Sequence, residues 1–210
     1  MFIELVDALR CPTRHEESWL VAASTRSEFR HIVDGTLGCP VCLAQYPIRR
    51  GVADFRRAPH ASVTPGATPD ADEAGRLAAF LDLTDQGGFA VLMGSWSVHA
   101  PPLRALVETP LIVVDPPADT EGEPGISVIR CDGELPLGAG AARGMAIDIG
   151  TEQRVASAVR ATRVKGRLVA PVQVPLPAGA SELARDDRVW VAERDAPASP
   201  LVALHIRRGR

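Results

Sequence analysis

Lysine and aromatic residues are scarce in this sequence of 210 residues. Lys165 is the only lysine, so the chain offers no other lysine that could act as a nucleophile. Aromatic residues make up 4% of the chain, although hydrophobic residues of all kinds make up 46% and charged residues 23%. These proportions are typical of a folded, soluble protein and exclude an intrinsically disordered one.

The sequence also lacks a large net charge and a long apolar run. Its formal net charge is -3, which gives no reason to expect general binding to nucleic acid or to an anionic membrane. No apolar run approaches the ~20 residues that a membrane span requires. The first ten residues include Glu4 and Asp7 and do not have the pattern of a signal peptide. We therefore expect a cytoplasmic protein without membrane contact.

Composition divides the chain into three parts. Residues 1–57 hold three of the four cysteines. Residues 58–71 contain three prolines, a glycine and small polar residues, which is the composition of a linker. From residue 72 to residue 210, helical and strand patterns alternate. The sequence therefore predicts a small N-terminal domain (1–57), a linker (58–71) and a larger α/β domain (72–210).

Short apolar runs of strand length separate the helical patterns of the larger region. Helices are predicted over residues 72–83, 99–108 and 152–163. Buried strands are predicted over residues 89–93, 111–114, 126–129, 145–149 and 168–174. Two further segments, 188–192 and 201–206, alternate as the two arms of an antiparallel hairpin do. The pattern predicts an α/β fold with a Rossmann-like, mostly parallel sheet that ends in a C-terminal antiparallel hairpin.

A cluster of potential metal ligands lies in the N-terminal region. Cys39 and Cys42 are two residues apart, a spacing that directs two thiolates at one ion. Cys11 begins a second pair of this kind, but Arg14 stands where the second cysteine would be. His15, one residue later, can supply a nitrogen ligand instead. The sequence therefore predicts a zinc site with three cysteines and one histidine: Cys11, His15, Cys39 and Cys42.

A metal ion would supply folding energy that this region otherwise lacks. About 57 residues with few aromatic side chains bury little apolar area, and domains of this size commonly need a bound metal ion or a similar cross-link to be stable. The alternative is that the site has decayed, which leaves three buried thiols and a surface histidine. Cys131 has no cysteine neighbour in the sequence, so we predict that it is a plain buried thiol.

Three segments of the N-terminal region closely resemble one known family. They are Leu9-Arg10-Cys11-Pro12, Gly35-Thr36-Leu37-Gly38-Cys39-Pro40-Val41-Cys42 and Tyr46-Pro47-Ile48-Arg49-Arg50-Gly51-Val52-Ala53. The family is the small zinc-ribbon activator subunit of tRNA, rRNA and release-factor methyltransferases, with its short bacterial relatives. Its members stabilise a methyltransferase partner by pairing with the partner's sheet. The resemblance therefore implies a protein-binding ribbon and a protein partner.

The order of elements from Phe89 to Ile206 resembles a class I S-adenosylmethionine-dependent methyltransferase. Asp115 stands where that family places its ribose-binding acid. The segment 131–137 resembles the family's segment after the third strand, where an aspartate, here Asp132, contacts the adenine amino group. Gly94 matches the first glycine of the cofactor loop. The resemblance thus implies Gly94, Asp115 and Asp132 as cofactor-binding residues.

The cofactor loop itself departs from the family pattern. The family has a Gly-x-Gly-x-Gly run there, whereas Trp96 and Val98 stand at the second and third glycine positions. A large ring at residue 96 is expected to collide with the methionine part of the cofactor. The acid that the family carries on its first strand is also absent. The aspartates have ordinary alternatives as well: Asp115 and Asp132 suit turns, and Asp148 suits the cap of a helix.

Two hypotheses about function follow, and we weigh function by the site rather than by the fold. The first is a non-catalytic interaction or scaffold protein that combines a zinc ribbon with a pseudo-methyltransferase domain, without any catalytic residue. The second is an S-adenosylmethionine-dependent methyltransferase that has a divergent loop and acts on RNA or protein. A nucleic-acid-binding ribbon is disfavoured, because acidic residues nearly cancel the basic charge of the N-terminal region.

Overall fold

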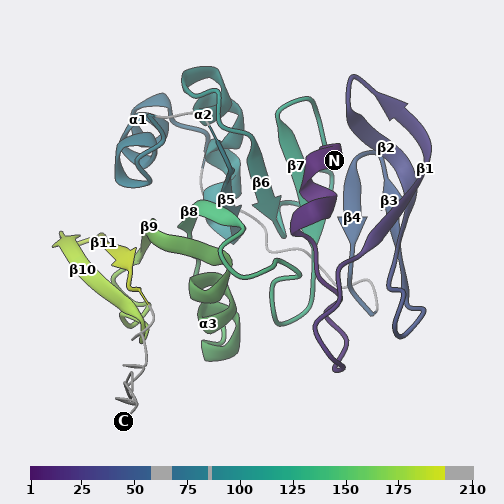
Figure 1. Ribbon diagram of the computed structural model, residues 1–210. Coiled ribbons are helices and arrows are strands. Elements are labelled where there is room, and N and C mark those ends of the chain that lie inside the picture. Colours follow the sequence, from purple (N-terminus) through teal and green to yellow (C-terminus); the bar gives the residue numbers. More distant parts are fainter. Residues whose placement is uncertain (58–67, 85–86, 197–210) are drawn as a thin grey trace, which may run out of the picture.

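The computed structural model describes residues 1–57, 68–84 and 87–196, and one continuous sheet runs through these residues (Figure 1). The sheet has 11 strands in the order β1-β2-β3-β4-β7-β6-β5-β8-β9-β11-β10. The strands of residues 1–57 are β1 (Val21–Glu28), β2 (His31–Gly38), β3 (Gln45–Arg49) and β4 (Val52–Asp54). The others are β5 (Phe89–Met93), β6 (Leu111–Val114), β7 (Ile126–Arg130), β8 (Ala142–Ala146), β9 (Thr162–Pro171), β10 (Ala180–Arg185) and β11 (Val189–Arg194).

Neighbouring strands are parallel from β4 to β9 and antiparallel at both ends of the sheet. The central strands β5 and β6 are almost wholly buried apolar runs, as expected for strands that are covered on both faces. Their observed bounds are the predicted ones. The predicted α/β fold with a mostly parallel sheet and a C-terminal antiparallel hairpin is therefore confirmed.

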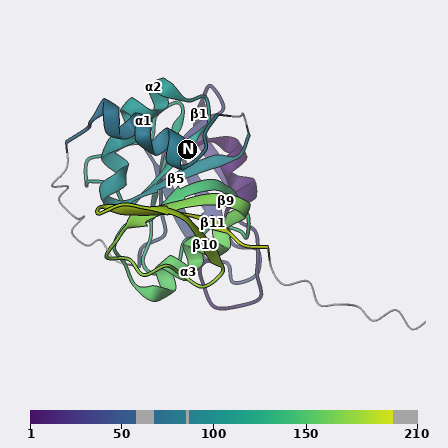
Figure 2. The ribbon, with the colours of Figure 1, turned by 90° about the vertical axis from the view of Figure 1, so that its left-hand side faces the viewer.

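Helices lie on both faces of the sheet. The α-helices are α1 (Ala71–Phe80), α2 (Ala100–Leu106) and α3 (Glu152–Ala161), and the 3-10 helices are η1 (Ile3–Ala8) and η2 (Gly94–His99). In Figure 2, α1 and α2 lie on one side of the sheet and α3 lies on the other. Within the described residues, every helix is too short or too polar to cross a lipid bilayer.

Short-range signals set the ends of these helices. The side chain of Asp70 accepts a hydrogen bond from the amide of Asp72 at 2.9 Å and caps α1. Thr151 caps α3 in the same way, at 3.3 Å from the amide of Arg154. The cap of α3 is therefore Thr151, and the interpretation of Asp148 as a helix cap is wrong. Of the predicted linker, residues 58–67 lie outside the described residues, and Ala71 already belongs to α1.

The C-terminal hairpin is made of β10 and β11. The predicted pairing of residues 188–192 with residues 201–206 is wrong, because β11 is hydrogen-bonded to β9 on one side and to β10 on the other. Residues 201–206 themselves lie outside the described residues. The sequence did not predict β10, because nearly all of its side chains are exposed at the edge of the sheet. A strand without a buried face does not need alternating apolar and polar residues.

The first 57 residues share a hydrophobic core with the α/β region. Met1, Leu5 and Leu9 are fully buried in the same cluster as Ile129 and Leu137. Burial of each such leucine contributes about 1.5–3 kcal/mol. In the described residues no helix separates β6 from β7 or β7 from β8, and η1 covers the sheet at that place (Figure 1).

Backbone hydrogen bonds fix this covering segment. Arg10 donates its amide to the carbonyl of Pro136 at 3.0 Å, and Gly138 donates to Ala8 at 2.8 Å. The Phe2 amide donates to the Ser127 hydroxyl of β7 at 3.0 Å. β4 also joins β7 as a parallel neighbour. The N-terminal region is thus bound to the α/β region through the core, through loops and through the sheet itself.

Candidate metal centre and a cavity at the carboxyl edge of the sheet

The structure brings all four predicted metal ligands together. The ligand atoms of Cys11, His15, Cys39 and Cys42 all lie within 4.8 Å of one another. Cys11 and His15 come from the segment before β1, whereas Cys39 and Cys42 come from the turn between β2 and β3. Arg14, which interrupts the first pair, is not a member of the cluster. The predicted set of three cysteines and one histidine is confirmed as a group that could hold a metal ion.

The distances within the cluster match tetrahedral coordination. Cys11 Sγ lies 3.7 Å from Cys42 Sγ, and Cys39 Sγ lies 3.5 Å from His15 Nε2. Around a tetrahedral zinc ion, sulfur ligands about 2.3 Å from the metal lie about 3.8 Å apart, and a sulfur–nitrogen pair lies about 3.5 Å apart. The residues present therefore fit a structural zinc ion, and four protein ligands leave no open position for a catalytic water.

Neighbouring groups orient the ligands. The Nδ1 atom of His15 is hydrogen-bonded to the carbonyl of Glu16, so Nδ1 carries the proton and the lone pair of Nε2 faces the cluster. The Tyr46 hydroxyl lies 3.3 Å from Cys11 Sγ and 3.2 Å from Thr13 Oγ1. Burial alone would raise the pKa of the Cys11 thiol, but hydrogen bonds from Tyr46 and Thr13 outweigh it and lower that pKa to about 6. The thiolate that a metal needs is thus favoured.

A second candidate site is a cavity of about 430 Å³ at the carboxyl ends of β5, β6, β7 and β8. β5, β6 and β7 follow one another toward one edge of the sheet, and β8 and β9 follow toward the other. The order in which successive strands are added to the sheet therefore reverses between β5 and β8, and open α/β sheets bind ligands at such a reversal. The cavity is lined by Arg56, Met93, Gly94, Asp115, Arg130, Cys131, Asp132, Gly133, Asp148, Ile149, Gly150, Thr151 and Arg154. The three residues predicted to bind cofactor, Gly94, Asp115 and Asp132, all belong to this lining.

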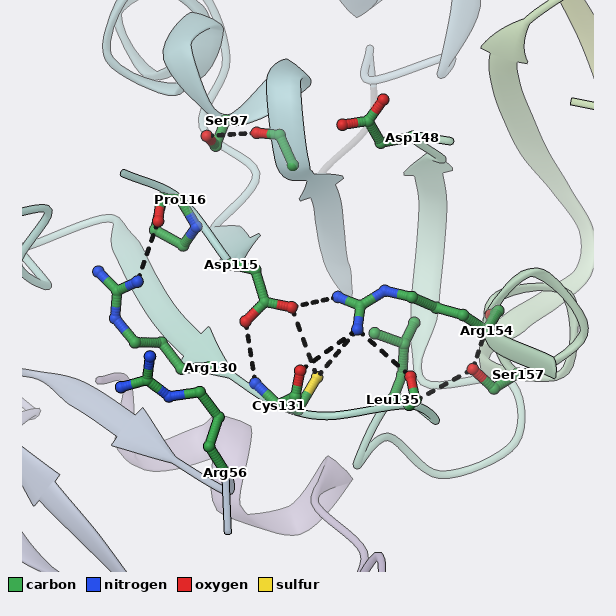
Figure 3. A network of polar contacts seen from close by, with 12 residues as sticks. Arg56, Ser97, Asp115, Pro116, Arg130, Cys131, Leu135, Asp148, Arg154 and Ser157 are labelled. Carbon is green, nitrogen blue, oxygen red and sulfur yellow. Dashed lines mark hydrogen bonds and ion pairs between the residues drawn. The ribbon is translucent and has the colours of Figure 1, made fainter. Parts of the chain in front are cut away.

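Asp115, however, is engaged with its own chain. Its Oδ1 accepts a hydrogen bond from the Cys131 amide at 2.9 Å, and its Oδ2 forms an ion pair with the guanidinium of Arg154 (Figure 3). Asp115 has a positive φ of 51°, a conformation that an aspartate tolerates better than most residues. The carboxylate therefore has a partner on each oxygen.

Arg154 projects from the first turn of α3 across the cavity (Figure 3). Besides Asp115, its guanidinium donates to the carbonyls of Cys131 and Gly133, each at 3.3 Å. Burial opposes the charge of Arg154, but the neighbouring Cys131 and Asp115 outweigh it and raise the pKa of the guanidinium. Sequence reasoning missed this residue. A cation in the first turn opposes the helix dipole, and that is the signal that could have indicated a tertiary partner.

Gly94 is crowded by Asp148. Gly94 has a φ of 54°, and a β-carbon built on it would lie 2.1 Å from Asp148 Oδ2. The same oxygen accepts a hydrogen bond from the Ser95 amide at 2.7 Å. Glycine is required here by both the backbone conformation and the carboxylate, and Asp148 occupies the space next to the loop.

The expectation that the Trp96 ring fills the cofactor position is wrong. Trp96 is 8% exposed and packs with the core beneath α1 and α2. Its indole nitrogen donates to the carbonyl of Ile147 at 3.0 Å. Neither Trp96 nor Val98 lines the cavity. The chain turns through η2 directly after Gly94, which carries residue 96 to the other side of the loop.

The remaining charged residues of the cavity have partners within the chain. Arg130 is 5% exposed and donates to the carbonyls of Pro116 at 2.9 Å and Pro117 at 2.8 Å. The Arg56 guanidinium pairs with Asp54 at 2.7 Å. Asp132 accepts from the amide of Arg57 at 3.0 Å.

Cys131 is a buried thiol, as the sequence predicted. It is 3% exposed, and burial raises its pKa to about 12. A thiol that stays protonated is a poor nucleophile and a poor metal ligand. Cys131 therefore contributes no chemistry to the cavity beyond its backbone groups and its bulk.

No protein-family profile and no curated protein match the chain. Among solved structures it is similar to the antibiotic-resistance methyltransferase Kmr (16% identity, 59% of this chain, 93% of that chain, TM-score 0.41). It is also similar to the aminoglycoside resistance methyltransferase NpmB1 (12% identity, 64% of this chain, 100% of that chain, TM-score 0.40). A third is the T. thermophilus 16S rRNA methyltransferase RsmC, solved with AdoMet and guanosine (20% identity, 70% of this chain, 46% of that chain, TM-score 0.34).

Proposed function

We propose that this protein is a zinc-stabilised, non-catalytic interaction protein built on a methyltransferase-like α/β sheet. The observation that carries the proposal is the ion pair between Asp115 and Arg154. A cofactor with a ribose needs the oxygens of an acid at this position, and here both have partners. The residues of the cavity as they stand do not fit S-adenosylmethionine.

The metal centre has a structural role in this proposal. Zinc would bind Cys11, His15, Cys39 and Cys42, and it would add folding energy by joining the segment before β1 to the turn between β2 and β3. With all four positions taken by protein ligands, the metal offers no Lewis-acid site to a substrate. The N-terminal region then serves as a fixed surface for binding.

A protein partner would bind at the ribbon patch, which we define as Val21, Val41 and Leu43. These side chains are 63%, 46% and 78% exposed, beside the turn that holds Cys39 and Cys42. β4 is already paired with β7 of the same chain, so pairing of that strand with a partner's sheet is not open to this protein. Exposed apolar side chains that gather near one place favour contact with another protein.

Titration of the purified protein with S-adenosylmethionine tests the proposal, with the zinc content measured by elemental analysis beforehand. We expect about one zinc per chain and no heat of binding at micromolar to millimolar cofactor. The matched ligand control is S-adenosylhomocysteine, which lacks the methyl group and the positive charge. Micromolar binding of either compound would refute the non-catalytic proposal, and protein without zinc would refute the role of the metal.

The second candidate is the methyltransferase with a divergent loop. One observation favours it: the fold brings Gly94, Asp115 and Asp132 to one cavity of about 430 Å³, a volume in the usual range of ligand sites. On this hypothesis Arg154 would leave Asp115 when the cofactor enters. The same titration decides between the two, and Asp115→Ala would then abolish the binding without unfolding the protein.

A further inference from the structure

Three acceptors at the carboxyl edge of the sheet share one donor. They are the Oδ2 of Asp115, the carbonyl oxygen of Cys131 and the carbonyl oxygen of Gly133. All three receive hydrogen bonds from the guanidinium of Arg154, which is 17% exposed at its side chain. Figure 3 shows the side chain reaching from α3 to the tips of β6 and β7. One flexible side chain therefore satisfies an acceptor set that the rigid sheet builds.

The acceptor set itself is held in place without Arg154. The Cys131 amide fixes Asp115 through Oδ1 at 2.9 Å, and the Asp115 amide donates to the carbonyl of Ile129 at 2.9 Å. These bonds continue the parallel pairing of β6 with β7. Leu135, beyond the acceptor loop, donates its amide to Ser157 Oγ at 3.1 Å. The carboxylate of Asp115 and the backbone of Cys131 thus keep these bonds when the guanidinium is lost.

The chemistry of these acceptors defines their ligand. One carboxylate oxygen and two backbone carbonyls bind donors only, and a carboxylate at the tip of a strand beside the reversal point binds a vicinal diol. Backbone carbonyls suit an exocyclic amine or a hydroxyl. A nucleoside combines these donors in one molecule, whereas a phosphate carries acceptors and would be repelled.

We propose that Arg154 is a built-in occupant of a nucleoside-binding position, and that it is the residue that keeps a nucleoside out. This inference rests on the proposed function, because it gives the reason why the non-catalytic protein would not bind a cofactor at the carboxyl edge of its sheet. Arg154 is a positioning residue in the present protein, since it links α3 to the tips of β6 and β7. Its replacement converts the closed edge into a binding site.

Calorimetric titration of the zinc-loaded full chain with adenosine and with S-adenosylmethionine tests the inference. For Arg154→Ala we expect a dissociation constant for adenosine at least ~10-fold lower than for the unchanged protein. Arg160→Ala is the matched control, because Arg160 lies on the same helix, pairs with Glu134 at 3.6 Å and lies outside the cavity lining. It is expected to leave binding unchanged.

Two further measurements distinguish adenosine binding at the position of the Arg154 guanidinium from nonspecific binding to a destabilised protein. The double variant Arg154→Ala/Asp115→Ala is expected to lose the gained binding, and millimolar guanidinium chloride is expected to weaken adenosine binding to Arg154→Ala by competing for the vacated position. If Arg154→Ala does not fold, Arg154→Met keeps the aliphatic stem while removing the five donors.

The outcomes distinguish the two proposals. Binding of S-adenosylmethionine by the unchanged protein refutes the proposed function. If neither the unchanged protein nor the folded variants Arg154→Ala and Arg154→Met bind adenosine or S-adenosylmethionine, the inference is overturned and the proposed function stands. Binding to Arg154→Ala that survives the loss of Asp115 also overturns it, because the ligand would then lie elsewhere.

Discussion

At the scale of single residues, two glycines in this chain face opposite surroundings. Gly94 has a φ of 54° and is pressed against the carboxylate of Asp148. Gly75 lies within α1, and a β-carbon there would meet nothing within 4 Å. The first glycine is required by the fold, whereas the second only increases the entropy of the unfolded chain.

The two glycines give a matched pair of variants. Gly94→Ala is expected to lower the free energy of unfolding by about 1–3 kcal/mol, because the positive φ is strained and Asp148 must move away from the Ser95 amide. Gly75→Ala is expected to raise it by about 0.5–1 kcal/mol. Urea denaturation of both variants measures the two effects. Equal stability of Gly94→Ala and the unchanged protein would show that Asp148 does not press on this loop.

At the scale of elements, the turn between β2 and β3 carries two of the four candidate metal ligands, Cys39 and Cys42. Cys39 donates its amide to Ala44 at 2.9 Å, and Leu43, which follows Cys42, has a positive φ of 61°. Cys42 is exposed, so its thiol adds little to the hydrophobic core. Any effect of replacing it therefore reports on the metal rather than on packing.

Cys42→Ser is expected to reduce the zinc content and to lower the melting temperature by roughly 5–10 °C, because metal that binds only the folded state stabilises it by mass action. A chelator should produce a similar fall in the unchanged protein and almost none in the variant. Val41→Ser is the control, since it changes an exposed side chain in the same turn without touching a ligand. Scanning calorimetry with and without chelator checks this, and a variant as stable as the unchanged protein would contradict it.

The elements also show where sequence could predict this structure. The bounds of β5 and β6 were predictable because a strand that is buried on both faces is an unbroken run of apolar residues in the sequence. The metal ligands were predictable because cysteine spacing is a local property. The orientation of Trp96 was not, because it depends on the turn that η2 takes. The contact of Arg154 with Asp115 was not either, because it joins residues 39 positions apart that no local pattern relates.

At the scale of the whole molecule, the N-terminal region and the α/β region complete each other. Fully buried Leu5 and Leu9 pack in the core beside β7, where the described residues of the α/β region supply no helix of their own. The backbone amide of Arg10 donates to the carbonyl of Pro136, and the amide of Gly138 donates to the carbonyl of Ala8, so backbone hydrogen bonds join the two regions. The predicted division at residues 57 and 72 therefore stays a prediction about composition that needs a direct test.

The test is a fragment that spans residues 72–210. It is expected to be molten or insoluble, because removal of residues 1–57 exposes the apolar side chains around Ile129 and Leu137 and leaves β7 as a sheet edge. Co-expression with residues 1–57 should restore a soluble complex of one copy each. Near-ultraviolet circular dichroism and dye binding check the packing, and cooperative unfolding of the fragment alone would establish an independent domain.

The parallel pairing of β4 with β7 also bears on competition between proteins. β4 and β7 belong to one chain, so the effective concentration of one strand beside the other is set by the chain that joins them and not by dilution. A separate strand in solution would have to displace a neighbour that dilution does not remove. Pairing of these two strands is therefore expected not to depend on protein concentration, because both strands always occur in equal number.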